Sequence, residues 1–238
     1  TEVERRAVED AAFNAGAREV YLIEEPMAAA IGARLPIYDP KANLIVDIGG
    51  GTAEVAVISL GGVVASTSLR IAGDKLNDDI VQYVKDEFRL LIGERTAEEI
   101  KISIGSVWPQ DENLEMEISG RDAVTGLPKE IKISSDEIRK ALVRSTRMII
   151  NAVKDTIEET PPELISDLTK KAVYLAGGGS LLRGFDTLLS HEIKLPVKII
   201  DDPLTTVVRG CGVVLEDVDK LKDVLISDNI KEYEGLQG

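Results

Sequence analysis

The sequence predicts an α/β protein, because strand-like and helix-like segments alternate along its 238 residues. Two apolar strand-like runs break directly into glycine triplets, Gly49–Gly51 and Gly177–Gly179. Glycine tolerates positive φ and close backbone approach, so such turns can present N–H groups to an anion. Asp47 stands two residues before the first triplet, at a predicted strand end where a carboxylate suits a magnesium ion and its waters. These features indicate a nucleotide-binding protein.

Six short apolar runs, rich in branched residues and bounded by turn residues, are predicted strands. They lie at residues 20–23, 44–48, 53–60, 63–71, 171–176 and 197–200. The glycine loop joins the second run to the third, and Gly61-Gly62 makes a hairpin turn into the fourth. Between residues 107 and 133 the composition changes, and the Thr125–Pro128 turn predicts a small strand–turn–strand insert.

Helices are predicted from apolar residues at three- and four-residue spacing, together with capping residues. They lie at residues 1–15, 27–34, 74–92, 96–103, 134–159, 180–193 and 203–215. Thr96 with Glu99 has the capping-box spacing, and Ser134 opens the long helix that Pro161-Pro162 ends. Ser180 is a natural N-cap after the second triplet. The charged tail after Lys220 is expected to fray.

Composition excludes several classes of protein. A hydrophobic content of 44% and a mean hydropathy of +0.01 are typical of a soluble globular protein. No apolar run approaches the roughly 20 residues that span a bilayer, and the polar start at residues 1–6 is unlike a signal peptide. A net charge of −14, without basic clusters that include aromatic residues, argues against a nucleic-acid partner.

Two residues with reactive side chains are expected to play no chemical role. Cys211 is the single cysteine, which excludes an intrachain disulfide and favours a reducing cytoplasm. It stands between two glycines in an apolar segment, and we expect a small buried packing residue. His191 has no neighbouring ligand or acid–base partner in the sequence and is expected on a helix surface.

The phrase Asp47-x-Gly-Gly-Gly-Thr-x-Glu-Val carries the strongest chemical signal. It sets an acid, three close-approach positions and a hydroxyl along one hairpin that could wrap a phosphate chain. It lacks the Gly-Lys-Ser/Thr of a Walker loop and the context of a Rossmann fingerprint. The alternatives stay open: either triplet could simply connect elements, and Glu24-Glu25 could simply cap a helix instead of orienting an attacking water.

Several phrases, in their order and spacing, resemble the actin and DnaK-type chaperone ATPase superfamily, and most closely the MreB family of bacterial actin-like cytoskeletal proteins. Glu-Glu-Pro-Met-Ala-Ala-Ala and Thr-Pro-Pro-Glu-Leu favour MreB over the DnaK-like chaperones. The phrases that carry the resemblance are residues 2–7, 23–32, 47–52, 71–74, 93–98, 160–164 and 177–184. The resemblance implies an actin-like (ribonuclease-H-like) ATPase fold, with a mixed sheet flanked by helices and a small α+β insert subdomain.

The resemblance also implies subdomain boundaries. Subdomain IIA would take residues 43–72 and 145–204, and subdomain IIB would take 73–144. Residues 1–42 would be a remainder of subdomain IA, and 205–238 a helix returning to IA with a tail. The family's first phosphate loop, of Asp-x-Gly-Thr type, is absent. The chain therefore resembles a family member truncated at its N-terminus, without subdomain IB and the membrane-contacting elements.

By the same resemblance, the site would bind ATP or ADP with Mg²⁺. Asp47 would hold the metal's water shell, and Glu25 would orient the hydrolytic water with help from Thr52. The phosphates would be contacted by Gly49, Gly50 and Gly51. One side of the adenosine would be bordered by Ala97, Glu98, Glu99 and Ile100, with Lys101 one position on. The opposite side would be covered by Gly177, Gly178, Gly179 and Ser180.

The implied function is that of an ATP-dependent filament that maintains rod cell shape by organising wall synthesis. Implied partners are copies of itself, the inner membrane and rod-complex scaffold proteins, at the cytoplasmic face of the membrane. The complete protein would be a weak ATPase and this chain inactive alone. The alternatives are a DnaK-type chaperone ATPase, a sugar or acetate kinase of the same superfamily, and a scaffold fragment that binds no nucleotide.

Overall fold

The computed structural model describes residues 2–226. Of the tail after Lys220 that is expected to fray, residues 227–238 lie outside the described residues, whereas Lys222–Val224 form a 3-10 turn with Val224 buried, contrary to that expectation. Its main sheet has five strands in the order β3-β2-β1-β7-β8. Their bounds are β1 Asn43–Ile48, β2 Ala53–Ser59, β3 Gly62–Leu69, β7 Val173–Ala176 and β8 Val197–Ile199. β1, β2 and β3 form an antiparallel meander, while β7 and β8 run parallel to β1. The predicted mixed sheet is confirmed.

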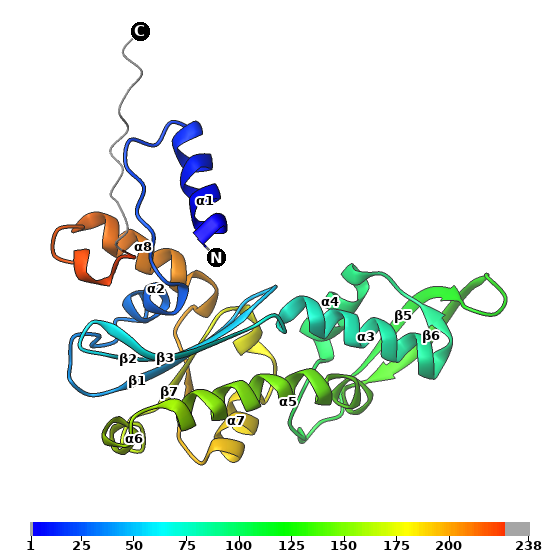
Figure 1. Cartoon of the computed structure of the whole chain (residues 1–238). Helices are drawn as coiled ribbons and strands as arrows, with labels where there is room; N and C mark the ends of the chain where they lie inside the picture. Colours follow the sequence, from blue (N-terminus) through cyan, green and yellow to red (C-terminus); the bar gives the residue numbers. More distant parts are fainter. Residues whose placement is uncertain (1, 227–238) are drawn as a thin grey trace, which may run out of the picture.

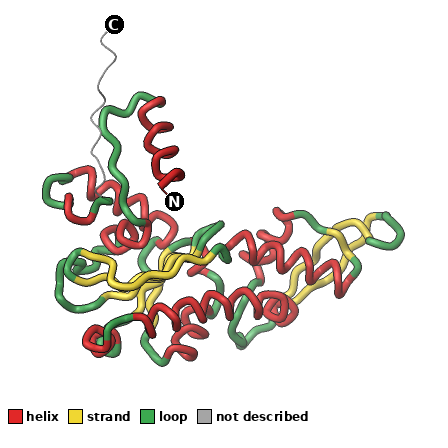
Figure 2. The backbone as a smooth tube through the Cα atoms, viewed as in Figure 1, coloured by secondary structure: helices red, strands yellow, loops and turns green. Residues whose placement is uncertain are grey.

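Helices cover both faces of this sheet (Figures 1 and 2). Alternate residues of β1 face opposite sides, so Leu44 and Val46 belong to one apolar core and Ile45 to another. The first core lies under α5, Ser135–Glu159, and α7, Phe185–Ile193. The second lies under α2, Glu25–Gly32, and α8, Thr206–Glu216.

The second structural unit lies at one end of the main sheet (Figure 1). It contains α3 Gly73–Phe88, β4 Leu90–Leu91, α4 Glu94–Ile104, β5 Glu115–Asp122 and β6 Pro128–Ser134. The three strands form a separate sheet in the order β4-β5-β6. Asp122 shapes the predicted hairpin turn, because its Oδ1 accepts hydrogen bonds from the N–H groups of Val124 and Thr125, each at 2.8 Å. The predicted insert is confirmed, while the subdomain boundaries stay predictions.

The long helix α5 joins the two units. Its first turn has a capping box, as predicted for Ser134: the Ser134 N–H and hydroxyl donate to Glu137 Oε2 at 2.8 and 2.7 Å. The helix runs from the small sheet, past α3, to β2 and β3 of the main sheet (Figure 1). One helix therefore contacts both units, on either side of the space between them.

α2 and α8 cross at very close range. A Cβ built on Gly210 would lie 1.8 Å from the carbonyl oxygen of Ala28, and one on Gly32 would lie 1.9 Å from that of Thr206. Both distances are far below any tolerated carbon–oxygen contact, so only glycine permits this crossing. The crossing ties the helix that begins at Glu25 to the helix that follows Pro203.

The N-terminal region differs from prediction in one element. α1, Glu2–Asn14, is a helix as predicted. Residues 20–23 are not a strand: Ile23 makes one isolated bridge to Leu225, and Leu22 accepts a hydrogen bond from Ile226. A strand needs a continuous partner, and only this short segment runs beside residues 20–23 in the described part of the chain.

Two predicted helix boundaries around the insert are wrong. α3 ends at Phe88 because Arg89 adopts φ of 53°, and Leu90–Leu91 then pair with β5. Thr96 is not an N-cap, since α4 begins two residues earlier with Gly93 in the N-cap position. Glu99 pairs with Arg95 at 3.1 Å instead of closing a capping box.

The segment after β7 also differs from prediction. Ser180 does not cap a helix, because Gly178–Leu181 forms a short 3-10 turn and Gly184, at φ of 75°, separates it from α7. An unpredicted helix, α6 at Pro162–Leu168, follows α5, since proline is accepted in a first helical turn.

The remaining expectations concern single residues and the membrane. Cys211 is half-buried, so it is more exposed than the small buried packing residue that is expected from the sequence. His191 is exposed on α7 as expected, with its ring 5.3 Å from that of Trp108. Within residues 2–226, no helix has the length and apolar character needed to cross a bilayer.

Candidate functional site

Both glycine turns open into one cavity of about 620 Å³ between the main sheet and the insert. Its lining comes from segments far apart in the sequence: the start of α2, the β1–β2 turn, the start of α3, the end of α4, the turn after β7 and the start of α8. Its lining includes Glu25, Asp47, Gly49, Gly50, Gly73, Asp74, Glu98, Lys101, Ile102, Gly177, Gly178, Gly179, Leu181, Leu204 and Val207.

The first glycine turn is held by its own backbone. The Gly49 N–H donates to the Thr52 carbonyl at 2.9 Å, and the Gly73 N–H donates back to the Gly49 carbonyl at 3.0 Å. The N–H groups of Gly50 and Gly51 donate no hydrogen bond to any described residue. Free N–H groups on a fixed turn suit the binding of an anion such as a phosphate.

Asp47 is a buried carboxylate at the floor of the cavity. It is 3% exposed, and its Oδ2 has no hydrogen-bond partner among the described residues. Burial, with a smaller contribution from the charges of Glu25 and Glu54, raises its pKa from 3.8 to about 6. Glu54 lies directly across the β1–β2 hairpin from it.

The chemistry of Asp47 fits a hydrated magnesium ion. Mg²⁺ keeps several waters and binds through one or two carboxylates plus substrate phosphates, so it needs no cage of protein ligands. The described residues contain no cluster of three or more His, Cys, Asp or Glu that would form such a cage. A cation beside Asp47 would compensate its unpartnered oxygen and the neighbouring acids.

Glu25 enters the cavity from the first turn of α2. Burial raises its pKa, and the charge of Glu54 adds to this effect. Glu24 holds the N-cap position but makes no side-chain capping bond. The capping alternative for Glu24 therefore receives no support from the geometry.

The second glycine turn lies directly against β1. A Cβ on Gly177, which has φ of 76°, would be 2.4 Å from Asp47 Oδ1, and one on Gly179 would be 2.3 Å from Ile48 Cγ2. Only glycine allows the turn to lie this close to the acid. Ser180 is fully buried and lies outside the cavity lining. Its hydroxyl donates to the Gly177 carbonyl at 2.6 Å and so stabilises the turn.

α4 forms the wall opposite the sheet. Glu98, Lys101 and Ile102 line the cavity, whereas Ala97 and Ile100 are buried in the core and Glu99 points to Arg95 in solvent. Gly51, Thr52 and Ser180 also lie outside the lining. The structure thus brings Glu25, Asp47, Gly49, Gly50, Glu98 and Gly177–Gly179 together, and their roles stay predictions.

Lys101 links α4 to the start of α3. Its Nζ donates to the Gly73 carbonyl at 2.9 Å, next to the first glycine turn. Burial lowers its pKa, and Glu98, Asp74 and Glu94 oppose that effect. Gly73 and Asp74 were not predicted as site residues, although the family phrase at residues 71–74 is a sequence signal that marks them.

An apolar wall completes the cavity and was not predicted. Ile102, Leu181 and Leu204 line it and are 66%, 52% and 69% exposed, and Val207 lies beside them. Exposed aliphatic side chains around a cavity provide a surface on which a flat ring system could pack. These residues come from α4, the turn after β7 and the start of α8, and no local pattern marks them.

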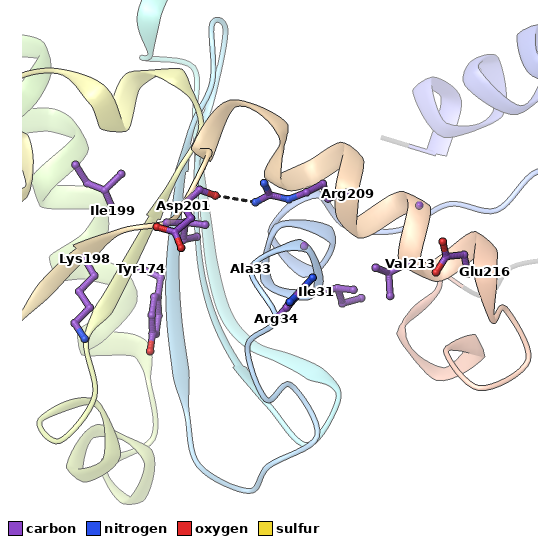
Figure 3. A pocket seen from close by; sticks show the side chains of 13 residues that line it. Ile31, Ala33, Arg34, Tyr174, Lys198, Ile199, Asp201, Arg209, Val213 and Glu216 are labelled. Carbon is purple, nitrogen blue, oxygen red and sulfur yellow. Dashed lines mark hydrogen bonds between the residues drawn. The ribbon is translucent and has the colours of Figure 1, made fainter.

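A second cavity, of about 750 Å³, is lined by residues from the end of α2, from β7, from β8 and the residues after it, and from α8 (Figure 3). Arg34, Tyr174, Lys198 and Arg209 are among its lining residues, and Arg209 donates to the Asp201 carbonyl at 2.9 Å. It contains neither glycine triplet nor an unpartnered buried carboxylate. Its chemistry does not match the site that the sequence indicates.

The mixed sheet, its two-sided helical cover and the paired glycine turns define the class of actin-like folds. The sequence matches the family described as MreB/Mbl protein over residues 1–223. The chain belongs to the MreB/Mbl family.

Curated relatives support this membership. The chain is 48% identical over 221 residues to the cell shape-determining protein Mbl of Bacillus subtilis (strain 168), covering 93% of the chain and 66% of Mbl. It is 52% identical over 219 residues to the cell shape-determining protein MreB of Escherichia coli (strain K12), covering 92% and 63%. The chain thus spans slightly less than two thirds of each relative's length.

Solved structures agree. MreB5 of Spiroplasma citri, in a crystal structure bound to AMPPNP, superposes with a TM-score of 0.89 at 41% identity, covering 92% of this chain and 66% of that one. A second MreB5 structure is bound to ADP and gives the same TM-score. A MamK double helical filament gives a TM-score of 0.68 at 22% identity, covering 82% and 59%, which supports the fold alone.

Proposed function

We propose that this chain carries the nucleotide-binding core of an actin-like filament protein that determines cell shape. One observation supports this most: both glycine turns and the unpartnered, buried Asp47 face a single cavity. MreB5 of Spiroplasma citri, which shares the fold, was crystallised with AMPPNP and with ADP. No observation favours the chaperone, kinase or scaffold alternatives.

Each residue of the site has a proposed role that suits its chemistry. The free N–H groups of Gly50 and Gly51 would bind phosphate oxygens, and Asp47 would hold the water shell of Mg²⁺, an ion that supplies positive charge to neutralise the phosphates. Glu25 orients the attacking water, since its raised pKa keeps the carboxylate basic enough to accept a proton. Lys101 and Glu98 border the nucleoside, and the apolar wall packs against its base.

Whether ATP or ADP is bound would then influence the assembly of filaments. The nucleotide contacts both the main sheet and the insert, so its hydrolysis changes which arrangement of the two units is favoured. Heterologous contacts between copies generate open filaments, as expected for a self-associating family member. We further propose that the complete protein works at the inner face of the membrane with scaffold proteins of wall synthesis.

The first test is calorimetric titration of the 238-residue chain with Mg-ATP. We expect weak binding and negligible turnover, because the sequence contains no Asp-x-Gly-Thr phosphate loop and half of the phosphate contacts are lacking. Titration without Mg²⁺ is the control. Tight, micromolar binding with sustained phosphate release would show instead that the second loop suffices.

The second test concerns Glu25 in a protein of the relatives' full length that contains this sequence. Glu25→Ala should leave the affinity for ATP nearly unchanged but slow phosphate release by about 100-fold, the typical contribution of general-base positioning. Glu24→Ala is the matched control and should retain activity. Equal phosphate release by both variants would exclude Glu25 from the proposed role.

A further inference from the structure

The middle of helix α5 is basic, although the chain as a whole has a net charge of −14. From residue 138 to 154 the helix contains basic residues and no acid. The basic residues are Arg139, Lys140, Arg144, Arg147 and Lys154. Such a local reversal of charge on an acidic protein marks a surface with a distinct electrostatic preference.

Three of these cations are unpaired. Arg139 pairs with Asp136, and Lys154 pairs with Glu192 of α7 at 2.7 Å. Lys140, Arg144 and Arg147 are exposed and form no ion pair or hydrogen bond with any residue in the range 2–226. Their spacing of i, i+4 and i+7 sets them in one row on the helix, about 10 Å long.

Two apolar side chains lie beside this row. Val143 is 46% exposed and Met148 is 40% exposed. Methionine is common at surfaces that adapt to protein partners. We call the five residues, Lys140, Val143, Arg144, Arg147 and Met148, the α5 patch. The opposite face of α5 packs on α3, β2 and β3, so the patch is presented by a rigid support.

We propose that the α5 patch docks a short acidic, amphipathic segment of a protein partner, with carboxylates on the three cations and apolar side chains on Val143 and Met148. The charge pattern selects a short occupant. Asp136 and Glu137 precede the patch, and Asp155, Glu158 and Glu159 follow it. A segment no longer than the patch meets only cations.

An anionic bilayer fits this surface less well. A flat membrane would meet the whole of α5, where five basic residues are balanced by five acids: Asp136, Glu137, Asp155, Glu158 and Glu159. It would also approach a chain with a net charge of −14. Attraction to anionic lipid grows with the number of uncompensated cations near the surface, and here the acids cancel them. The same argument disfavours nucleic acid.

The test uses fluorescence anisotropy with the full 238-residue chain. The probe is a labelled synthetic helical peptide with glutamates at i, i+4 and i+7 and leucines beside them. We expect saturable binding that weakens with salt. Arg144→Glu/Arg147→Glu should weaken it by about tenfold or more, because two attractive contacts become repulsive. Arg144→Lys/Arg147→Lys should retain most of the binding.

A matched control keeps the change in net charge but spares the patch. Arg18→Glu/Lys41→Glu reverses two exposed cations on other segments and should bind the peptide like the unchanged chain. Thermal melts check that all variants fold. Equal peptide binding by the patch and control variants would overturn the proposal. So would patch-dependent binding only to phosphatidylglycerol vesicles, or only to a second copy in sedimentation velocity.

This inference does not rest on the proposed nucleotide site. The charge-reversed chain should bind Mg-ATP as the unchanged chain does, since none of the patch residues lines the cavity. Loss of peptide binding with unchanged nucleotide binding separates the two proposals.

Discussion

Asp47→Asn is expected to stabilise the nucleotide-free protein while abolishing its magnesium-dependent binding of nucleotide. The folded state raises the pKa of Asp47 from 3.8 to about 6, so holding the charged form in the folded protein costs free energy. Two pKa units correspond to about 3 kcal/mol. The uncharged amide of asparagine avoids this cost, but it binds Mg²⁺ much more weakly than a carboxylate does.

The raised pKa of Asp47 makes the free energy of unfolding depend on pH. Between pH 3.8 and about 6 the folded protein holds a proton that the unfolded chain has lost. The stabilising contribution of Asp47 is therefore complete below that range and is lost as the pH rises through 6. Urea unfolding should show the asparagine variant about 2 to 3 kcal/mol more stable at pH 7 and equal near pH 4.

Asp74→Asn serves as the control, because Asp74 lines the same cavity but is exposed. It should change stability little at either pH. Calorimetry with and without Mg²⁺ completes the comparison. A loss of stability for Asp47→Asn at pH 7, or an unchanged response of nucleotide binding to magnesium, would contradict the assignment of Asp47.

The second large effect is expected at the crossing of α2 and α8. Gly210→Ala should destabilise the protein by about 3 kcal/mol, because overpacked contacts cost 1 to 3 kcal/mol or more. The new Cβ would lie 1.8 Å from the Ala28 carbonyl oxygen, and backbone atoms cannot move aside without separating the helices. The midpoint of urea unfolding measures the loss.

Gly212 provides a control within the same helix. A Cβ on Gly212 meets no atom within 4 Å. Gly212→Ala should therefore gain up to about 1 kcal/mol from helix propensity alone. Unfolding midpoints that shift equally for both variants would show that the crossing tolerates a side chain, contrary to the geometry.

Local sequence patterns predicted most of the fold, and the errors occur where pairing with a distant segment determines the secondary structure. Leu44–Ile48 was predicted correctly, because it is apolar except for Asp47 and ends in a glycine turn. Residues 20–23 are equally apolar but lack a continuous partner strand in the described chain. Leu90–Leu91 were assigned to a helix, because their pairing with residues 121–122 cannot be read locally.

The candidate site likewise contains residues that the sequence predicts and residues that it does not. The acid and the glycines were predictable because close backbone approach requires particular residue types, and Gly177 indeed lies against Asp47. The apolar wall was not, since Ile102, Leu181 and Leu204 are ordinary aliphatic residues brought together only by the fold. Ser180 was mistaken for a helix cap because a short turn and its buried hydroxyl have no distinct local pattern.

The β1–β2 hairpin sets Asp47 directly opposite Glu54, and Ser68 donates to Glu54 at 2.6 Å. Like charges across an antiparallel pair repel, so the pairing of β1 with β2 is opposed by an electrostatic repulsion. Under the proposed metal site, a bound divalent ion relieves that repulsion, and the free energy of its binding adds to the free energy of unfolding. Removal of magnesium by a chelator would then lower the free energy of unfolding, so the magnesium concentration in the cell would help to set the stability of the fold.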